Sequence, residues 1–307
     1  MENLDIDSIE SNLYKKMHSA LLKNLQDAYS RYGRLFEHDF VAILTLLFTK
    51  DLFCILKEFF PDYQFGITGI FCHQKPIVKF KERGVELGDL LFIYKYTDEN
   101  NKETYNSLLT QAKVAKNYSN IKSGDKLQLE LYQTWPEFTY TKGALKGIRR
   151  DIYCKKPTDG AQFLLFDNNP VSTKEYPGVF PIGFAKVLSE MSQYRVYPDF
   201  SKDLIKFLKF DNGRKFEAEK DIHNDSTNWS QMIWDLINIC KDAFFKRKKI
   251  GIKEGNRYNE YNNYMQKSDL ESPPLFDGTT NRNITSEEEN APSIVCIEAK
   301  KHQSINQ

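Results

Sequence analysis

Apolar residues recur at three- and four-residue steps near the start of the chain, which predicts two consecutive helices. Within residues 8–32 these steps are Ile9, Leu13, Met17, Leu21, Leu22, Leu25 and Ala28. Gly33 would end this helix. Residues 34–60 are more strongly apolar at the same spacing and stop at Pro61, which cannot continue a helix. We expect this second helix to lie in the core.

Residues 64–115 change to short runs rich in Ile, Val, Phe and Tyr, a pattern typical of strands and hairpins. Two such runs, GVELGDLLFIYKY (84–96) and YNSLLTQAKVAK (105–116), flank the hydrophilic turn TDENNKET. A hairpin centred near residues 100 and 101 would pair residues whose numbers sum to about 201. Asp89 would then lie opposite the stretch from Gln111 to Lys113.

The rest of the chain extends this alternation of helices and strands. Helices are predicted at 124–135, at 181–194 with a proline at its start and at 227–249, and a buried strand is predicted at 161–166. Residues 253–292 are rich in Asn, Glu, Ser and Tyr, which predicts a long polar loop. The last apolar run, SIVCIEA (293–299), could return to the sheet. The pattern therefore favours an α/β fold with helices flanking a sheet.

Charge and cysteine content narrow the classes of partner. Lys and Arg number 43 against 42 Asp and Glu, so binding to nucleic acid would need a local basic patch. The five cysteines are scattered without a CxxC pair, which favours a reducing cytosol. The start is acidic and polar, and no apolar run approaches the roughly 20 residues that span a bilayer. We therefore expect a cytoplasmic protein with no membrane partner.

The predicted hairpin brings candidate catalytic side chains together. Gln111 and Lys113 are two residues apart, so they leave their strand on the same face, opposite Asp89. An acid, an amide oxygen and an ammonium would converge there. An acid and a lysine on adjacent strands also often form only a surface pair worth a few tenths of a kcal/mol.

This arrangement resembles the PD-(D/E)xK nuclease superfamily, whose restriction-endonuclease-like fold joins an acid beginning one strand to an acid-x-Lys triplet on the next. The matching residues are Asp89 and the triplet Gln111-Ala112-Lys113. Gly88 replaces the proline and Gln111 replaces the triplet's acid, and both departures occur within the superfamily. Glutamine offers a carbonyl oxygen to Mg²⁺ but no charge, so metal affinity should be lower unless another acid contributes.

Glu37 is the expected additional acid, because at helical spacing it shares a face with an inward apolar stripe. The resemblance implies the same, since many members supply an acid from the helix before the sheet. The alternative is that Glu37 only occupies a first helical turn, where a carboxylate suits the helix dipole. Glu86 is the second candidate, although on a strand three residues before Asp89 it should point to the other face.

A Q-x-x-x-Y pattern follows on the predicted helix at 124–135, formed by Gln128 and Tyr132. Residues four apart share one helix face. The pattern is common by chance, but it recurs after the catalytic lysine in the exonuclease-like branch of the superfamily. The resemblance spans roughly residues 34 to 166.

The resemblance implies a mixed central sheet flanked by helices, with accessory C-terminal helices. Residues 1–33 would form an N-terminal helix, 34–170 the nuclease-like core and 171–307 an accessory region. The implied activity is hydrolysis of phosphodiester bonds in DNA with Mg²⁺, or Mn²⁺ as a substitute, in prokaryotic defence or restriction.

The resemblance also implies a role for each site residue. Asp89, Glu37 and the Gln111 carbonyl would hold the metal. Lys113 would orient the nucleophile or stabilise developing charge.

Two alternatives stay open. A competing match, Asp277 with Glu298 and Lys300, has a true acid in its triplet, but no strand is predicted to carry Asp277 beside Glu298. A catalytically silent module on the same fold, which binds nucleic acid or protein, is compatible with Gln111.

Basic residues at 146–156 are the candidates for contact with DNA phosphates. They are Lys146, Arg149, Arg150, Lys155 and Lys156. Such runs are more often solvated faces. No P-loop motif occurs, so a gating sensor or ATPase would be a separately encoded partner. Many such nucleases dimerise to cut both strands of a duplex, so the resemblance also implies a homodimer.

Overall fold

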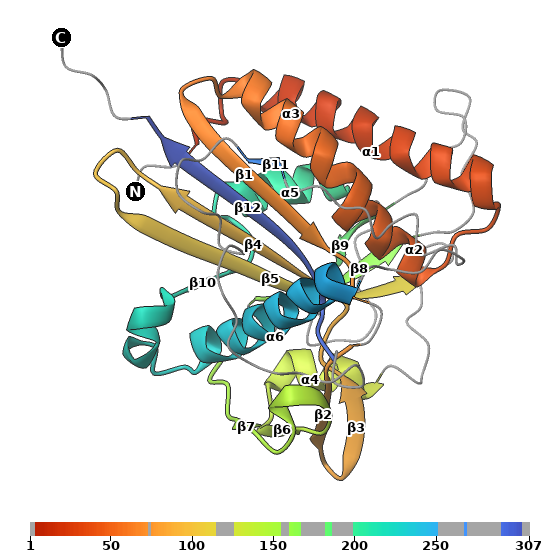
Figure 1. The fold of residues 1–307 in the computed structure, drawn as a ribbon, viewed down its shortest axis with the longest axis vertical. Coiled ribbons are helices and arrows are strands. Elements are labelled where there is room, and N and C mark those ends of the chain that lie inside the picture. The colour runs from red at the N-terminus through yellow and green to blue at the C-terminus, as the bar shows by residue number, and fades with distance from the viewer. Residues whose placement is uncertain are drawn as a thin grey trace.

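The structure of the protein is a computed structural model. It describes residues 4–72, 75–114, 126–154, 160–166, 182–185, 199–250, 267–268 and 290–302. In this part of the chain an eight-stranded mixed sheet forms the centre, in the order β11-β1-β12-β4-β5-β8-β9, with β10 paired to β5. A second, smaller sheet has the order β3-β2-β6-β7. Figure 1 shows the small sheet and α4 together at one end of the molecule.

The strands of the large sheet are β1 (Tyr63–Ile70), β4 (Leu90–Thr97), β5 (Glu103–Val114), β8 (Ala161–Phe166), β9 (Ile182–Ala185), β10 (Arg214–Phe216), β11 (Lys267–Ser268) and β12 (Ser293–Lys301). The small sheet contains β2 (Ile77–Phe80), β3 (Arg83–Glu86), β6 (Phe138–Tyr140) and β7 (Arg149–Arg150). The helices are α1 (Glu10–Tyr32), α2 (Glu37–Ala42), α3 (Thr49–Phe59), α4 (Lys126–Thr134), α5 (Phe200–Leu208) and α6 (Trp229–Ile250). Short 3₁₀ turns cover Gly143–Leu145 and Glu219–Asn224.

The two N-terminal helices confirm the predictions from apolar spacing. Gly33 ends α1 with a positive φ of 71°. The predicted second helix is one helical stretch in which α2 and α3 are joined by a π-helical segment, Ile43–Phe48. This segment brings the backbone carbonyl of Thr45 against β1, where a Cβ on Gly69 would lie 1.6 Å from the Thr45 oxygen. Only glycine allows that approach.

The predicted hairpin is formed by β4 and β5, with Leu90 paired to Thr110 and Thr97 to Glu103. This register lies one residue from the predicted one. The expected strand over 84–96 is interrupted, because β3 pairs with β2 in the small sheet. The chain therefore changes sheets immediately before Asp89.

The last described strand, β12, returns to the sheet as expected. It lies between β1, to which it is antiparallel, and β4, to which it is parallel. The large sheet thus continues beyond residue 170. Of the predicted polar loop at 253–292, the structure describes 267–268, which pair with β1, and 290–292.

The helix predicted at 181–194 is wrong for its first residues. Ile182–Ala185 form β9, which pairs antiparallel with β8, and residues 186–194 lie outside the described part of the chain. A short apolar run fits either element by its period alone. Here the run pairs with β8 and forms a strand.

Helices cover both faces of the large sheet (Figure 1), and each face has its own apolar cluster. Side chains of α1, α2, α3 and α5 pack on one face, and those of α4 and α6 pack on the other. On β5, Leu108 and Ala112 face the first cluster and Leu109 faces the second. By alternation, Gln111 and Lys113 leave β5 on the second face.

None of the helices in the described residues combines the length and apolar composition needed to cross a membrane.

Candidate active site

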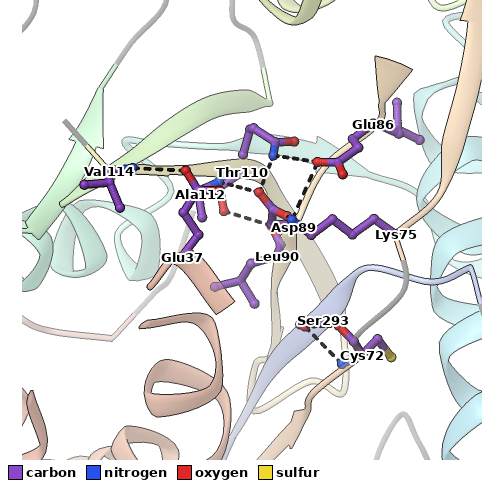
Figure 2. A network of polar contacts seen from close by, with 12 residues as sticks. Glu37, Cys72, Lys75, Glu86, Asp89, Leu90, Thr110, Ala112, Val114 and Ser293 are labelled. Carbon is purple, nitrogen blue, oxygen red and sulfur yellow. Dashed lines mark hydrogen bonds and ion pairs between the residues drawn. The ribbon is translucent and has the colours of Figure 1, made fainter. Parts of the chain in front are cut away.

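Asp89 is fixed by backbone hydrogen bonds to the strands on both sides of it. Its amide donates to the carbonyl of Thr110 on β5 over 2.8 Å, and its carbonyl accepts from the amide of Ser293 on β12 over 2.9 Å. One carboxylate oxygen, Oδ2, accepts from the amide of Ala112 over 2.7 Å. Figure 2 shows this carboxylate at the centre of a polar network. The Asp89 side chain is fully buried, and its neighbours in the sheet fix its position.

Gln111 lies beside Asp89, as the hairpin predicts, but it turns its amide nitrogen rather than the expected carbonyl oxygen toward the carboxylate. Its Nε2 donates to Asp89 Oδ2 and, over 3.1 Å, to Glu86 Oε2. Its carbonyl oxygen, Oε1, is buried and has no hydrogen-bond partner among the described residues. Such atoms are uncommon and each needs an explanation, although Tyr140 Oη and Gln162 Oε1 share this state. An oxygen-binding cation would supply one.

Glu86 also reaches the site, although its spacing predicted the opposite face. The prediction assumed one continuous strand through Asp89, whereas Glu86 ends β3 in the small sheet. Alternation along a single strand therefore does not apply. The Glu86 carboxylate contacts Gln111 and lies 3.6 Å from the ammonium of Lys75.

Lys75 is the site residue that sequence reasoning missed. Its ammonium forms an ion pair with Asp89 Oδ1, as Figure 2 shows, and its side chain is 24% exposed. The register of the short β2–β3 hairpin, in which Ile77 pairs with Glu86, could have indicated its position. Extending this register by two residues places Lys75 opposite Gly88, next to Asp89.

Glu37 lies at the start of α2, and its Oε1 accepts from the amide of Val114 over 3.2 Å. The amides of Ala112 and Val114 face the same edge of β5, beyond the beginning of β4. Asp89 and Glu37 therefore cap neighbouring amides on this open edge (Figure 2). Glu37 therefore lies in the first turn of α2 and also close to Asp89.

Lys113 follows Gln111 by two residues on β5 and is half-buried. The structure therefore places the predicted lysine on the same face of the sheet as Gln111, at the end of the strand.

Gln128 and Tyr132 are both buried on α4. The Tyr132 hydroxyl donates to the carbonyl of Leu87 over 2.8 Å, so α4 holds the segment that leads into Asp89. Gly88 in this segment has a packing reason, because a Cβ there would lie 2.7 Å from the Leu109 side chain.

Burial shifts the acid–base properties of the central pair. Burial raises the pKa of Asp89 to about 6, although the neighbouring Lys75 ammonium lowers it. Burial alone would lower the pKa of Lys75, but Asp89, Glu86 and Glu37 raise it overall. Lys75 is therefore a cation at neutral pH.

The competing triplet is described only in part. Asp277 lies outside the described residues, as do Lys155 and Lys156 of the basic cluster. Glu298 is buried in the middle of the sheet, where β12 pairs it with Gly66 and Lys95.

The basic residues of β7 contact acids of this chain. Arg149 forms an ion pair with Glu137. Arg150 donates to both carboxylate oxygens of Asp235, over 2.7 and 3.1 Å. Lys146, before β7, is exposed.

Within the described ranges, no three His, Cys, Asp or Glu residues form a group that could hold a metal ion. The site instead holds two carboxylates, Asp89 and Glu86, both bound to Gln111 Nε2, and the unpartnered carbonyl oxygen of the same Gln111 side chain. Hard cations such as Mg²⁺ take oxygen ligands of these types and often keep several waters.

Comparisons of this chain with protein-family models, curated proteins and solved structures found no match.

Proposed function

We propose that this protein is a metal-dependent DNA endonuclease that hydrolyses phosphodiester bonds. The observation that supports this most directly is the buried Oε1 of Gln111, which has no hydrogen-bond partner among the described residues. It belongs to a side chain whose Nε2 donates to two carboxylates, those of Asp89 and Glu86. A mixed sheet flanked by helices, with an acid and a Q-x-K triplet on adjacent strands, is compatible with the restriction-endonuclease-like fold.

Asp89 and the Gln111 carbonyl would hold Mg²⁺ or Mn²⁺, with Glu86 supplying the charge that Gln111 lacks. Glu37, on the same edge of β5, is a further candidate ligand. Bound Mg²⁺ would lower the pKa of a water and neutralise phosphate charge.

Lys113 would contribute the positive charge at the mouth of the site. Its ammonium would orient the attacking water or stabilise charge that develops on the phosphate oxygens. Gln128 and Tyr132 would act indirectly, because Tyr132 holds the carbonyl of Leu87 and thereby the approach to Asp89.

The proposal extends to the setting of the protein. DNA is the proposed partner, and the proposed location is the cytoplasm of a prokaryotic cell that uses the enzyme in defence or restriction. Cutting both strands of a duplex would favour a homodimer. A separately encoded sensor or ATPase would control the activity.

The direct test is incubation of supercoiled plasmid with the purified, metal-stripped protein. We expect nicked or linear DNA with Mg²⁺ or Mn²⁺ and intact plasmid with EDTA. Intact plasmid under all conditions, together with retention of the protein on DNA at low salt, would instead indicate a binding module.

That silent module is the second candidate, and the ion pair of Lys75 with Asp89 favours it. A carboxylate whose charge is balanced by an ammonium is a poorer metal ligand. DNA retention that weakens steeply with salt would identify phosphate contacts. A protein that neither cuts nor binds DNA would point to a protein-interaction role.

The pKa of Asp89 predicts the acid limb of the pH profile. With its pKa raised to about 6, Asp89 is protonated below this pH and must lose a proton before it can bind metal. At subsaturating Mg²⁺ we expect the cleavage rate to rise between roughly pH 5 and pH 7, with its midpoint near 6. Circular dichroism at each pH is the control for folding. A rate that is constant over this range would contradict the prediction.

A further inference from the structure

We propose that the ammonium of Lys75 occupies the cation position between Asp89 and Glu86, so that Lys75 and a divalent metal compete for the same carboxylates. This inference rests on the metal site of the proposed function. It adds that the chain carries its own competitor for the metal.

The division of contacts around Asp89 supports a single cation position. Oδ2 accepts from the amide of Ala112 and from Gln111 Nε2, so this oxygen is committed to β5. Oδ1 faces away from those donors and forms the ion pair with Lys75. Glu86 Oε2 lies 3.6 Å from the same ammonium.

The charges of the cluster make simultaneous occupancy unfavourable. Two carboxylates and one ammonium leave one net negative charge when all three are ionised. A divalent ion bound to Asp89 Oδ1 would lie within a few ångströms of the ammonium, where like charges repel strongly in a buried site. Metal binding should therefore displace the ammonium.

Lys75 can leave the site without unfolding the protein. Its side chain is about a quarter exposed, whereas the Asp89 side chain is fully buried. A lysine has a long flexible stem, so its ammonium can move into water while the backbone stays in place. In the metal-free protein the same ammonium offsets the repulsion between Asp89 and Glu86. The expected consequence is a site whose apparent affinity for metal is lower than its carboxylates alone would give.

The test is a titration of metal-stripped protein with Mn²⁺ at pH 8, followed by calorimetry and by electron paramagnetic resonance of the unbound ion. We expect Lys75→Met to bind Mn²⁺ about tenfold more tightly or better, as removal of a neighbouring like charge predicts. Lys75→Arg, which keeps the charge, should bind no more tightly than the parent. Lys79→Met is the matched control, because Lys79 lies on β2 and pairs with Glu82 away from the site.

The double variant Lys75→Met/Asp89→Asn tests whether the tighter binding of Mn²⁺ depends on Asp89. We expect it to lose the Mn²⁺ affinity that Lys75→Met gains. If Lys75→Met does not fold, as thermal unfolding in EDTA would show, Lys75→Gln carries the same expectation. Equal or weaker Mn²⁺ binding by the folded neutral variant would overturn the inference.

The outcomes separate this inference from the proposed activity. Tighter Mn²⁺ binding by Lys75→Met, with no DNA cleavage by any form, would support the competition and contradict the nuclease. Metal-dependent cleavage by the parent, with unchanged Mn²⁺ affinity in Lys75→Met, would support the nuclease and contradict the competition.

Discussion

Replacing Lys113 with alanine should lower metal-dependent plasmid cleavage by about 100-fold or more, the scale on which one stabilising group acts in a transition state. Lys113 extends from the same face of β5 as Gln111. The change removes the ammonium that would face the phosphate and leaves the backbone of β5 intact. The Mn²⁺ affinity should not fall, because the proposed ligands are unchanged. Cleavage rates at saturating Mg²⁺ give the measurement.

Lys102→Ala is the matched control for this loss. Lys102 is an exposed lysine at the other end of the β4–β5 hairpin, so its removal changes the net charge equally without touching the site. We expect it to cut plasmid at the parent rate. Cleavage by Lys113→Ala at the rate of Lys102→Ala would remove Lys113 from the proposed mechanism.

Gly69→Ala should be the most destabilising single methyl addition described here. The new Cβ would lie 1.6 Å from the backbone oxygen of Thr45 and 3.2 Å from Thr49 Cγ2. The first of these is a backbone atom of a buried helix, so it cannot rotate away as a side chain would. We expect the free energy of unfolding to fall by about 3 kcal/mol or more, at the upper end of overpacking costs. Urea denaturation followed by circular dichroism measures this change.

Gly84→Ala provides the comparison. Gly84 lies on β3, and a Cβ there would meet only Ile77 Cγ2 at 3.5 Å, an ordinary contact. The free energy of unfolding of Gly84→Ala should stay within about 0.5 kcal/mol of the parent's, as for most surface substitutions. Equal stability of the two variants would mean that the π-helical segment does not press on β1 as described.

The parts predicted correctly are those in which local pattern and pairing agree. Apolar spacing gave α1, the helical stretch through α2 and α3, and α6. The polar turn between two β-rich runs gave the β4–β5 hairpin within one residue, and with it the meeting of Asp89 and Gln111. Hydrophobic periodicity and turn chemistry are strong signals for such elements.

The parts that were missed depend on contacts between distant segments. Lys75, and the orientation of Glu86, were missed because the chain leaves the small sheet just before β4, so alternation along a single strand does not describe this segment. β9 forms because β8 offers it an edge. The order of strands around β12 is also nonlocal, since its partners begin at residues 63 and 90.

The position of β12 makes assembly of the site depend on a strand that is synthesised long after β1 and β4. β1 and β4 leave the ribosome about 200 residues before the strand that separates them, so the middle of the sheet cannot close until that strand emerges. The same strand supplies the Ser293 amide that binds the Asp89 carbonyl. A nascent chain would therefore carry every proposed catalytic residue and still lack an assembled catalytic centre.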